Sequence, residues 1–68
     1  NLRELRQALG KTQIEVADAA KIQQSELSKV ERRQDHLIST LRRYVNALGG
    51  ELEGSARFSD KIVKLSGV

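Results

Sequence analysis

Cysteine is absent from this 68-residue chain, and histidine, tyrosine and phenylalanine each occur once. The absence of cysteine excludes a disulfide framework and most structural zinc sites. A single histidine excludes a histidine-based metal site as well, so we expect no metal. A chain of this length holds one domain at most, and such a core rarely stabilises a fold by more than about 3–5 kcal/mol. We therefore expect oligomerisation, as a homodimer, to supply further stability.

The sequence also lacks an apolar stretch long enough to cross a membrane, and no signal-peptide pattern opens it. It has no glycine-rich loop that could cradle phosphates and no histidine spaced to act with a carboxylate. These absences predict a cytoplasmic protein that does not associate with membranes. They also predict that the chain is not an enzyme and needs no cofactor.

Charge is present in moderate excess and is unevenly distributed. The net charge is +3, yet residues 51–68 are neutral, because three basic residues balance three acidic ones. The whole positive excess therefore lies in residues 1–50. A basic excess of this size is compatible with nucleic-acid binding but does not establish it.

Apolar spacing predicts two short helices in the first 21 residues. Leu2, Leu5 and Leu9 stand at i, i+3 and i+7, an apolar stripe that stops at a glycine. The pair Thr12 and Glu15 has the spacing of a capping box, in which each residue satisfies a backbone N–H at a helix start. The second helix should end near residue 21 and present small residues to the core: Val16, Ala17 and Ala20.

Two further helices are expected after a short turn. The spacing of Leu27 and Val30 predicts a third helix over residues 24–33. A fourth helix should start at Ser39 or Thr40 and end at Gly49–Gly50, since glycine is favoured just after a helix. Its apolar residues recur at i, i+3, i+4 and i+7: Leu41, Tyr44, Val45 and Leu48.

The pattern changes at residue 51 from a period of 3.6 to a period of 2. Alternation over 52–58 predicts a half-buried strand, residues 59–60 a turn, and 62–65 a second short strand. A lone two-stranded hairpin is marginal in water, so it must pack on the helices or pair with another chain. We expect residues 51–68 to contribute to dimerisation, through strand pairing or through apolar side chains: Leu52, Phe58, Ile62 and Leu65.

The third helix has an unusually polar outward side. On a helical wheel, Ser25, Lys29 and Arg32 fall opposite the inward side, with Gln24 and Ser28 on one flank. Such groups can read base edges and hold phosphates in a major groove. Taken alone, the helix is better explained as a surface helix with a solvated face, because charged outward rows are usual on such helices. Its neighbours, however, favour the base-reading interpretation. A tightly packed helix with small core residues, followed by a short turn and a polar helix, is the arrangement of a helix-turn-helix motif.

The segment "TQIEVADAAKIQQSELSKVE", residues 12–31, resembles the pattern T-Q-x-E-L-A-x-x-x-G-[VI]-x-Q-x-x-[VI]-S-[RK]-[VIW]-E of the XRE family, the Cro and phage-repressor type. The resemblance covers residues 2 to about 50. It implies a mostly α fold, a four-helix lambda-repressor-like domain over 1–50, followed by the C-terminal β-hairpin. The tail "GGELEGSARFSDKIVKL" more loosely resembles the strand-rich end of host-inhibition-of-growth type antitoxins.

The resemblance also implies roles for individual residues. The residues expected to read bases are Gln24, Ser25, Lys29, Gln23 and Ser28. Those expected to contact phosphates are Gln13, Thr12, Arg32, Arg33, Arg42 and Arg43. Gln13 should also brace Gln24, whereas Arg6 and Glu31 should form a structural ion pair between helices one and three. His36 is expected to be a loop residue without a special role.

Two departures from the family pattern concern the turn. Lys21 stands where the family usually has glycine, and a left-handed backbone there costs a non-glycine residue about 1–2 kcal/mol. Gln23 replaces the usual serine or threonine cap, which weakens the start of the third helix.

Two functional hypotheses follow. The first is a sequence-specific regulator of double-stranded DNA, expected to be a homodimeric repressor on an inverted-repeat operator and to be nucleoid-associated in bacteria. By resemblance it would be the antitoxin of a toxin–antitoxin pair, with a toxin protein as a second partner. The alternative is a protein-interaction module of the same fold, in which the third helix docks on a protein rather than on DNA.

Overall fold

The structure is a computed structural model that describes residues 1–68. Four helices come first: α1 (Leu2–Ala8), α2 (Gln13–Ala20), α3 (Gln24–Arg32) and α4 (Ile38–Ala47). Two antiparallel strands follow, β1 (Gly54–Arg57) and β2 (Ile62–Leu65), with Gly54 opposite Leu65 and Arg57 opposite Ile62. The order of elements confirms the predicted fold class. No helix reaches the length and apolarity needed to cross a bilayer.

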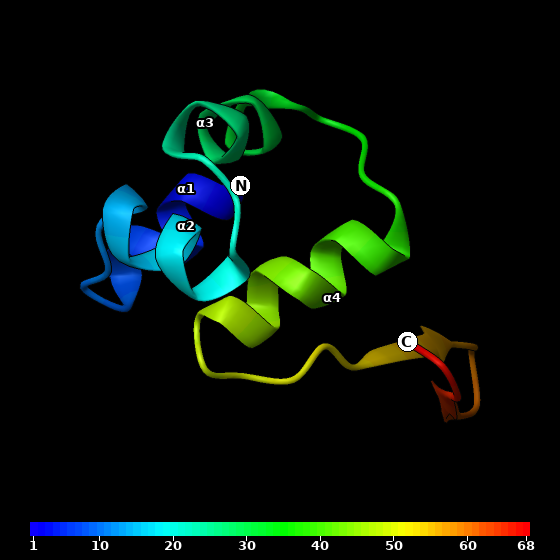
Figure 1. The fold of residues 1–68 in the computed structure, drawn as a ribbon. Helices are drawn as coiled ribbons and strands as arrows, with labels where there is room; N and C mark the ends of the chain where they lie inside the picture. Colours follow the sequence, from blue (N-terminus) through cyan, green and yellow to red (C-terminus); the bar gives the residue numbers. More distant parts are fainter.

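The core lies where α2, α3 and α4 meet. It consists of five buried apolar residues, Val16, Ala17, Leu27, Tyr44 and Leu48, with Leu2, Ile22, Val30 and Ala47 packed against it. The small residues on the inward side of α2 allow both α3 and α4 to approach it. Figure 1 shows α3 and α4 on different sides of α2, joined by a loop that arches over the outside. This arrangement leaves one long side of α3 free.

The apolar stripe predicted for the first helix is wrong in part. Leu2 packs on the core, but Leu5 and Leu9 are 41% and 53% exposed. The inward position one turn after Leu2 is occupied by Arg6, which is buried. The side chain that joins α1 to the rest of the domain is therefore polar, and its burial requires a charged partner.

Three element boundaries differ from the sequence-based expectation. The helix α3 ends at Arg32, because Arg33 has the extended backbone of a C-cap (φ −72°, ψ 149°). The helix α4 starts at Ile38, with Leu37 as an N-cap that has no side-chain hydrogen bond, so neither Ser39 nor Thr40 starts it. The strand β1 spans four residues instead of 52–58. Its pairing with β2 begins at Gly54, opposite Leu65, and the chain turns at Phe58, whose N–H donates to Lys61 O at 2.8 Å.

The hairpin extends beyond α4 and packs on none of the four helices (Figure 1). The molecule is correspondingly long, with principal extents of 43 × 21 × 19 Å. Its link to the helices includes a hydrogen bond from the Arg42 guanidinium to Gly67 O. The apolar side chains Phe58, Ile62 and Leu65 are 55%, 58% and 42% exposed, and Leu52 is half-buried.

Candidate nucleic-acid interface

The start of α2 is fixed by the predicted capping box. Thr12 Oγ1 accepts a hydrogen bond from the Glu15 N–H, and Glu15 Oε1 accepts one from the Thr12 N–H, both at 3.1 Å. The Thr12 hydroxyl also lies 3.0 Å from Glu15 Oε1. The hydrogen bonds from Thr12, first from its backbone and then from its hydroxyl, lower the pKa of Glu15. This cap places Gln13 in the first turn of α2.

The turn between α2 and α3 has a left-handed backbone at Lys21. Its φ and ψ are 59° and 44°, and no other non-glycine residue in the chain has a positive φ. The turn is closed by the Ile22 N–H, which donates to Ala17 O at 3.0 Å. The lysine therefore adopts a backbone conformation that glycine would adopt without strain.

The helix α3 buries Leu27 and exposes the opposite side. Ser25, Lys29 and Arg32 are all exposed, as are Gln23 and Gln24, whereas Ser28 is half-buried at the edge of the row. None of Lys29, Arg32 and Arg33 forms an ion pair. Gln23 is the N-cap and makes no side-chain capping bond. The outward row of α3 thus offers its polar groups to solvent or to a ligand.

A buried ion pair lies directly behind this row. Arg6 Nε donates to Glu31 Oε2 at 2.6 Å, and a second guanidinium N–H donates to Glu31 Oε1 at 3.2 Å. The Arg6 guanidinium also donates to Lys11 O at 2.9 Å. The Glu31 side chain is fully buried and that of Arg6 is 9% exposed. Arg6 and Glu31 thereby join α1 to α3 through a buried ion pair.

Two more side chains converge on the Glu31 carboxylate. Tyr44 in α4 donates its hydroxyl to Glu31 Oε2 at 2.6 Å, and Gln13 donates its amide N–H to Glu31 Oε1 at 3.0 Å. Burial by itself would raise the pKa of Glu31, but the hydrogen bonds from Arg6, Tyr44 and Gln13 outweigh it and hold that pKa below its ordinary value. Burial, together with the bond to Glu31, raises the pKa of Tyr44.

The hydrogen-bonded chain continues from Gln13 to the surface. A carboxylate can only accept, so Gln13 must direct its N–H to Glu31 and its carbonyl oxygen away from it. That oxygen accepts the Gln24 amide N–H at 3.3 Å. Gln24 therefore keeps its own carbonyl oxygen and one N–H free at the start of α3. Side chains of α1, α2, α3 and α4 are coupled through Glu31, and the coupling reaches the exposed row.

The remaining predicted residues occupy other parts of the surface. Arg33 is exposed at the C-cap of α3. Arg43 donates to Ala20 O at 3.3 Å, which ties α4 to the last residue of α2. Arg42 contacts the C-terminal segment rather than the α2–α3 unit. Arg42 is therefore not brought together with the outward row of α3, whereas Arg43 lines the same hollow as Lys29 and Arg33.

Sequence reasoning missed two contributions to the site. Tyr44 was expected only as a core residue, although an aromatic side chain with a polar tip requires a hydrogen-bond partner when buried. His36 was expected to have no special role, yet its Nε2 lies 2.7 Å from Val30 O in the last turns of α3. The tyrosine hydroxyl was the signal that could have been noticed, whereas nothing in the spacing of His36 indicated its contact.

Comparison with known proteins agrees with this geometry. The family profile described as Helix-turn-helix (HTH_3) matches residues 2–54. The chain is 45% identical over 67 residues to "Putative antitoxin HigA2" of Mycobacterium tuberculosis (strain ATCC 25618 / H37Rv). That match covers 96% of this chain and 66% of the relative, so the chain spans just under two thirds of the relative's length.

Two solved structures are similar along nearly the whole chain. A HigA antitoxin described by "Induced DNA bending by unique dimerization" superposes with a TM-score of 0.91 at 38% identity, covering 97% of this chain and 91% of that one. The "DNA bound antitoxin HigA3" has a TM-score of 0.87 at 36% identity, covering 97% and 88%. With the family profile matching most of its length, the chain belongs to the HTH_3 family of helix-turn-helix proteins.

Proposed function

We propose that this chain is a sequence-specific regulator that binds double-stranded DNA with α3 in the major groove. The proposal rests on how the exposed polar row of α3 is supported. This row forms no ion pair, and the buried Glu31 carboxylate orients Gln24, at the start of the row, through Gln13. A helix that is merely solvated has no need for an oriented amide at its start. Gln24 retains one acceptor and one donor, the combination that pairs with adenine in a major groove.

The base contacts are proposed for the exposed side chains of α3 and for its N-cap: Gln24, Ser25, Lys29, Gln23 and Ser28. The phosphate contacts are proposed for the residues around this row, Gln13, Thr12, Arg32 and Arg33, and for Arg42 and Arg43 on α4. Gln13 is well placed because it lies in the first turn of α2, where free backbone N–H groups attract phosphate. Thr12 is included because it is exposed directly before Gln13, although both its hydroxyl and its backbone N–H are bonded to Glu15 in the capping box.

We further propose that the protein acts as a homodimer, with residues 1–50 as the DNA-binding domain and 51–68 as the dimerisation element. The hairpin packs on none of the helices and exposes Phe58, Ile62 and Leu65, which supports a second copy as its partner. Two α3 helices related by twofold symmetry should lie about 34 Å apart, one turn of DNA. The operator should accordingly be an inverted repeat.

The relatives support a more specific assignment, to the antitoxin of a toxin–antitoxin pair. One relative is described as DNA bound, another as bending DNA through its dimerization, and all three are described as antitoxins. By analogy this chain would repress its own operon and bind a toxin protein. Such a protein would act in the cytoplasm, on the nucleoid. Co-expression with the product of the adjacent gene, followed by size exclusion, tests the toxin assignment, and separate elution of the two proteins would contradict it.

DNA binding is tested by fluorescence anisotropy with a duplex from the upstream region of the gene and a scrambled duplex of equal length. Tight binding to the first duplex alone, weakening steeply with salt, is the expected result, because phosphate contacts release counterions. Equal and weak binding to both would place the operator elsewhere and contradict autoregulation. Absence of binding even at low salt would contradict DNA binding and favour a protein that docks on α3.

A further inference from the structure

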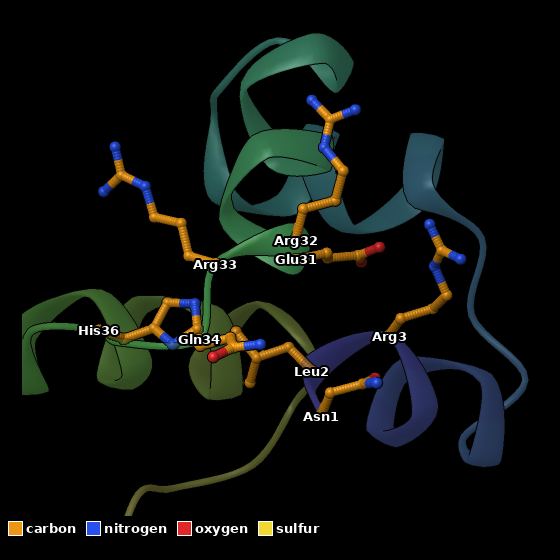
Figure 2. Close-up of a pocket in the computed structure, with 8 residues that line it drawn as sticks. All are labelled: Asn1, Leu2, Arg3, Glu31, Arg32, Arg33, Gln34 and His36. Atoms are coloured by element: carbon orange, nitrogen blue, oxygen red, sulfur yellow. The ribbon is translucent and has the colours of Figure 1, made fainter.

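An open hollow of about 590 Å³ lies between the start of α1 and the end of α3. Leu2 is the one hydrophobic residue in its lining, so the hollow does not suit an apolar ligand. Its lining includes three guanidinium groups, from Arg3, Arg32 and Arg33, together with Glu31 and His36 (Figure 2). Arg3 was not among the residues expected to contact DNA.

The hollow carries a net positive charge. Glu31 is the single acidic residue in its lining, and that carboxylate is already paired with Arg6 and hydrogen-bonded to Tyr44 and Gln13. None of Arg3, Arg32 and Arg33 forms an ion pair, and all three are exposed. Three guanidinium groups thus line a hollow whose single carboxylate, that of Glu31, is already neutralised by Arg6. Such a site selects an anion with several acceptor oxygens.

Figure 2 shows how the arginines divide between two sides of the hollow. Arg3 and Arg32 extend on the side toward which the Glu31 carboxylate points, whereas Arg33 extends on the other side, beside His36. The hollow lies at the C-terminal end of α3, where backbone carbonyls and not N–H groups are free. An anion there must be held by side chains alone, and Arg3 and Arg32 are the two arginines on the side toward which Glu31 points.

We propose that this hollow binds one phosphate of the DNA backbone, held between Arg3 of α1 and Arg32 of α3. The inference rests on the proposed DNA-binding function, because Arg32 is both a lining residue and the last member of the outward row of α3. The floor of the hollow is also continuous with the proposed DNA face, since Gln13 donates to Glu31. The first helix thereby adds a phosphate contact to those of α2 and α3.

The test is the salt dependence of DNA affinity for the wild type, Arg3→Gln and the control Lys21→Gln. Lys21 is an exposed lysine at the C-cap of α2 that forms no ion pair and does not line the hollow. Each phosphate contact contributes about 0.9 to the slope of log affinity against log salt, so a dimer of Arg3→Gln should lose about 1.8. Affinity should fall equally for every sequence, whereas Lys21→Gln should keep the wild-type slope. Thermal unfolding should be unchanged in both variants.

The possible results separate this inference from the proposed function. A wild-type slope in Arg3→Gln, with DNA binding intact, overturns the inference alone. A wild type that binds no duplex overturns the proposed function and the inference with it. A titration of the free protein with inorganic phosphate, followed through the His36 ring signals by NMR, distinguishes the source of the anion. Suppose that phosphate saturates the site below about 1 mM, that Arg3→Gln abolishes this binding, and that the same variant keeps the wild-type salt dependence of DNA affinity. The hollow would then bind a small free anion, and its assignment to a DNA phosphate would be overturned.

Discussion

Arg6 and Glu31 lie 25 positions apart in the sequence and 2.6 Å apart in the fold, at the one place where α1 and α3 are joined by charge. The pair is buried, yet each partner is satisfied: no buried side-chain nitrogen or oxygen in the chain lacks a hydrogen bond. Because Gln13 and Tyr44 bond to the same carboxylate, one acidic residue coordinates the packing of all four helices.

Replacement of Glu31 by glutamine should strongly destabilise the fold, because Arg6 would remain buried without a counter-charge. The loss expected for breaking a buried pair is about 3–5 kcal/mol in the free energy of unfolding. Urea denaturation followed by circular dichroism measures it. The matched control is Glu26→Gln, an exposed glutamate in the first turn of the same helix that forms no ion pair. Equal stability of the two variants would show that the pair contributes little.

The same carboxylate predicts a loss of stability in acid. Its pKa is lower in the folded state than the ordinary value of 4.5, so the unfolded chain binds a proton more readily. The stabilisation is therefore fully present above about pH 4.5 and is lost as the pH falls through the folded pKa of Glu31. Urea midpoints of the wild type between about pH 6 and pH 3 should fall more steeply than those of Glu31→Gln. Parallel curves would contradict the assignment to Glu31.

Tyr44→Phe should cost less than the loss of Glu31, because Arg6 still neutralises the carboxylate. A hydrogen bond to a charged group contributes about 1.5–3 kcal/mol, and a value in this range is expected. The wild type should also lose stability above about pH 10. The folded state holds Tyr44 neutral while the unfolded chain ionises there, so the contribution is present below the ordinary pKa of 10.0 and declines above it. If Tyr44→Phe shows the same alkaline decline, other groups cause it.

Much of this architecture could be predicted from residue spacing, because apolar periodicity reports directly on burial. The three core residues of α2 and α3 and the change of period after Gly50 were readable in this way. The buried residues of α1 could not be predicted in this way, because a rule based on apolar spacing places Leu5 and not Arg6 in the core. Only the long-range partner Glu31 makes burial of the arginine favourable, and spacing within one helix contains no information about such a partner.

The candidate site was predictable to a similar extent. The polar row of α3 follows from a helical wheel, and the brace between Gln13 and Gln24 follows from a family resemblance. That Arg3 and Arg32 line the same hollow could not be predicted from the sequence, because it depends on how α1 packs against α3. Likewise, the separation of the hairpin from the helices follows from the path of residues 48–53, which no local pattern determines.

Lys21→Gly should stabilise the protein. The lysine adopts φ 59°, a conformation that costs a residue with a Cβ about 1–2 kcal/mol, and glycine removes this cost. Part of the gain is offset by the greater freedom of glycine in the unfolded chain, so a net increase of about 0.5–1 kcal/mol is expected. The control is Lys11→Gly, in the loop before α2, where φ is not positive and the same change should destabilise. Thermal and urea unfolding of both variants test the sign.

Gln24→Ala should relax base preference at one operator position instead of weakening binding to all sequences. Its free carbonyl oxygen and N–H are held in place by Gln13, so the loss should be confined to the base pair that they read, at about 1–3 kcal/mol. Arg43→Gln removes an exposed arginine on α4 that is proposed to contact phosphate, and it should by contrast weaken binding to all duplexes alike. Anisotropy against duplexes that carry each base pair in turn distinguishes the two patterns. A uniform loss for Gln24→Ala would mean that this glutamine contacts the backbone, and the orienting contact from Glu31 through Gln13 would then serve stability alone.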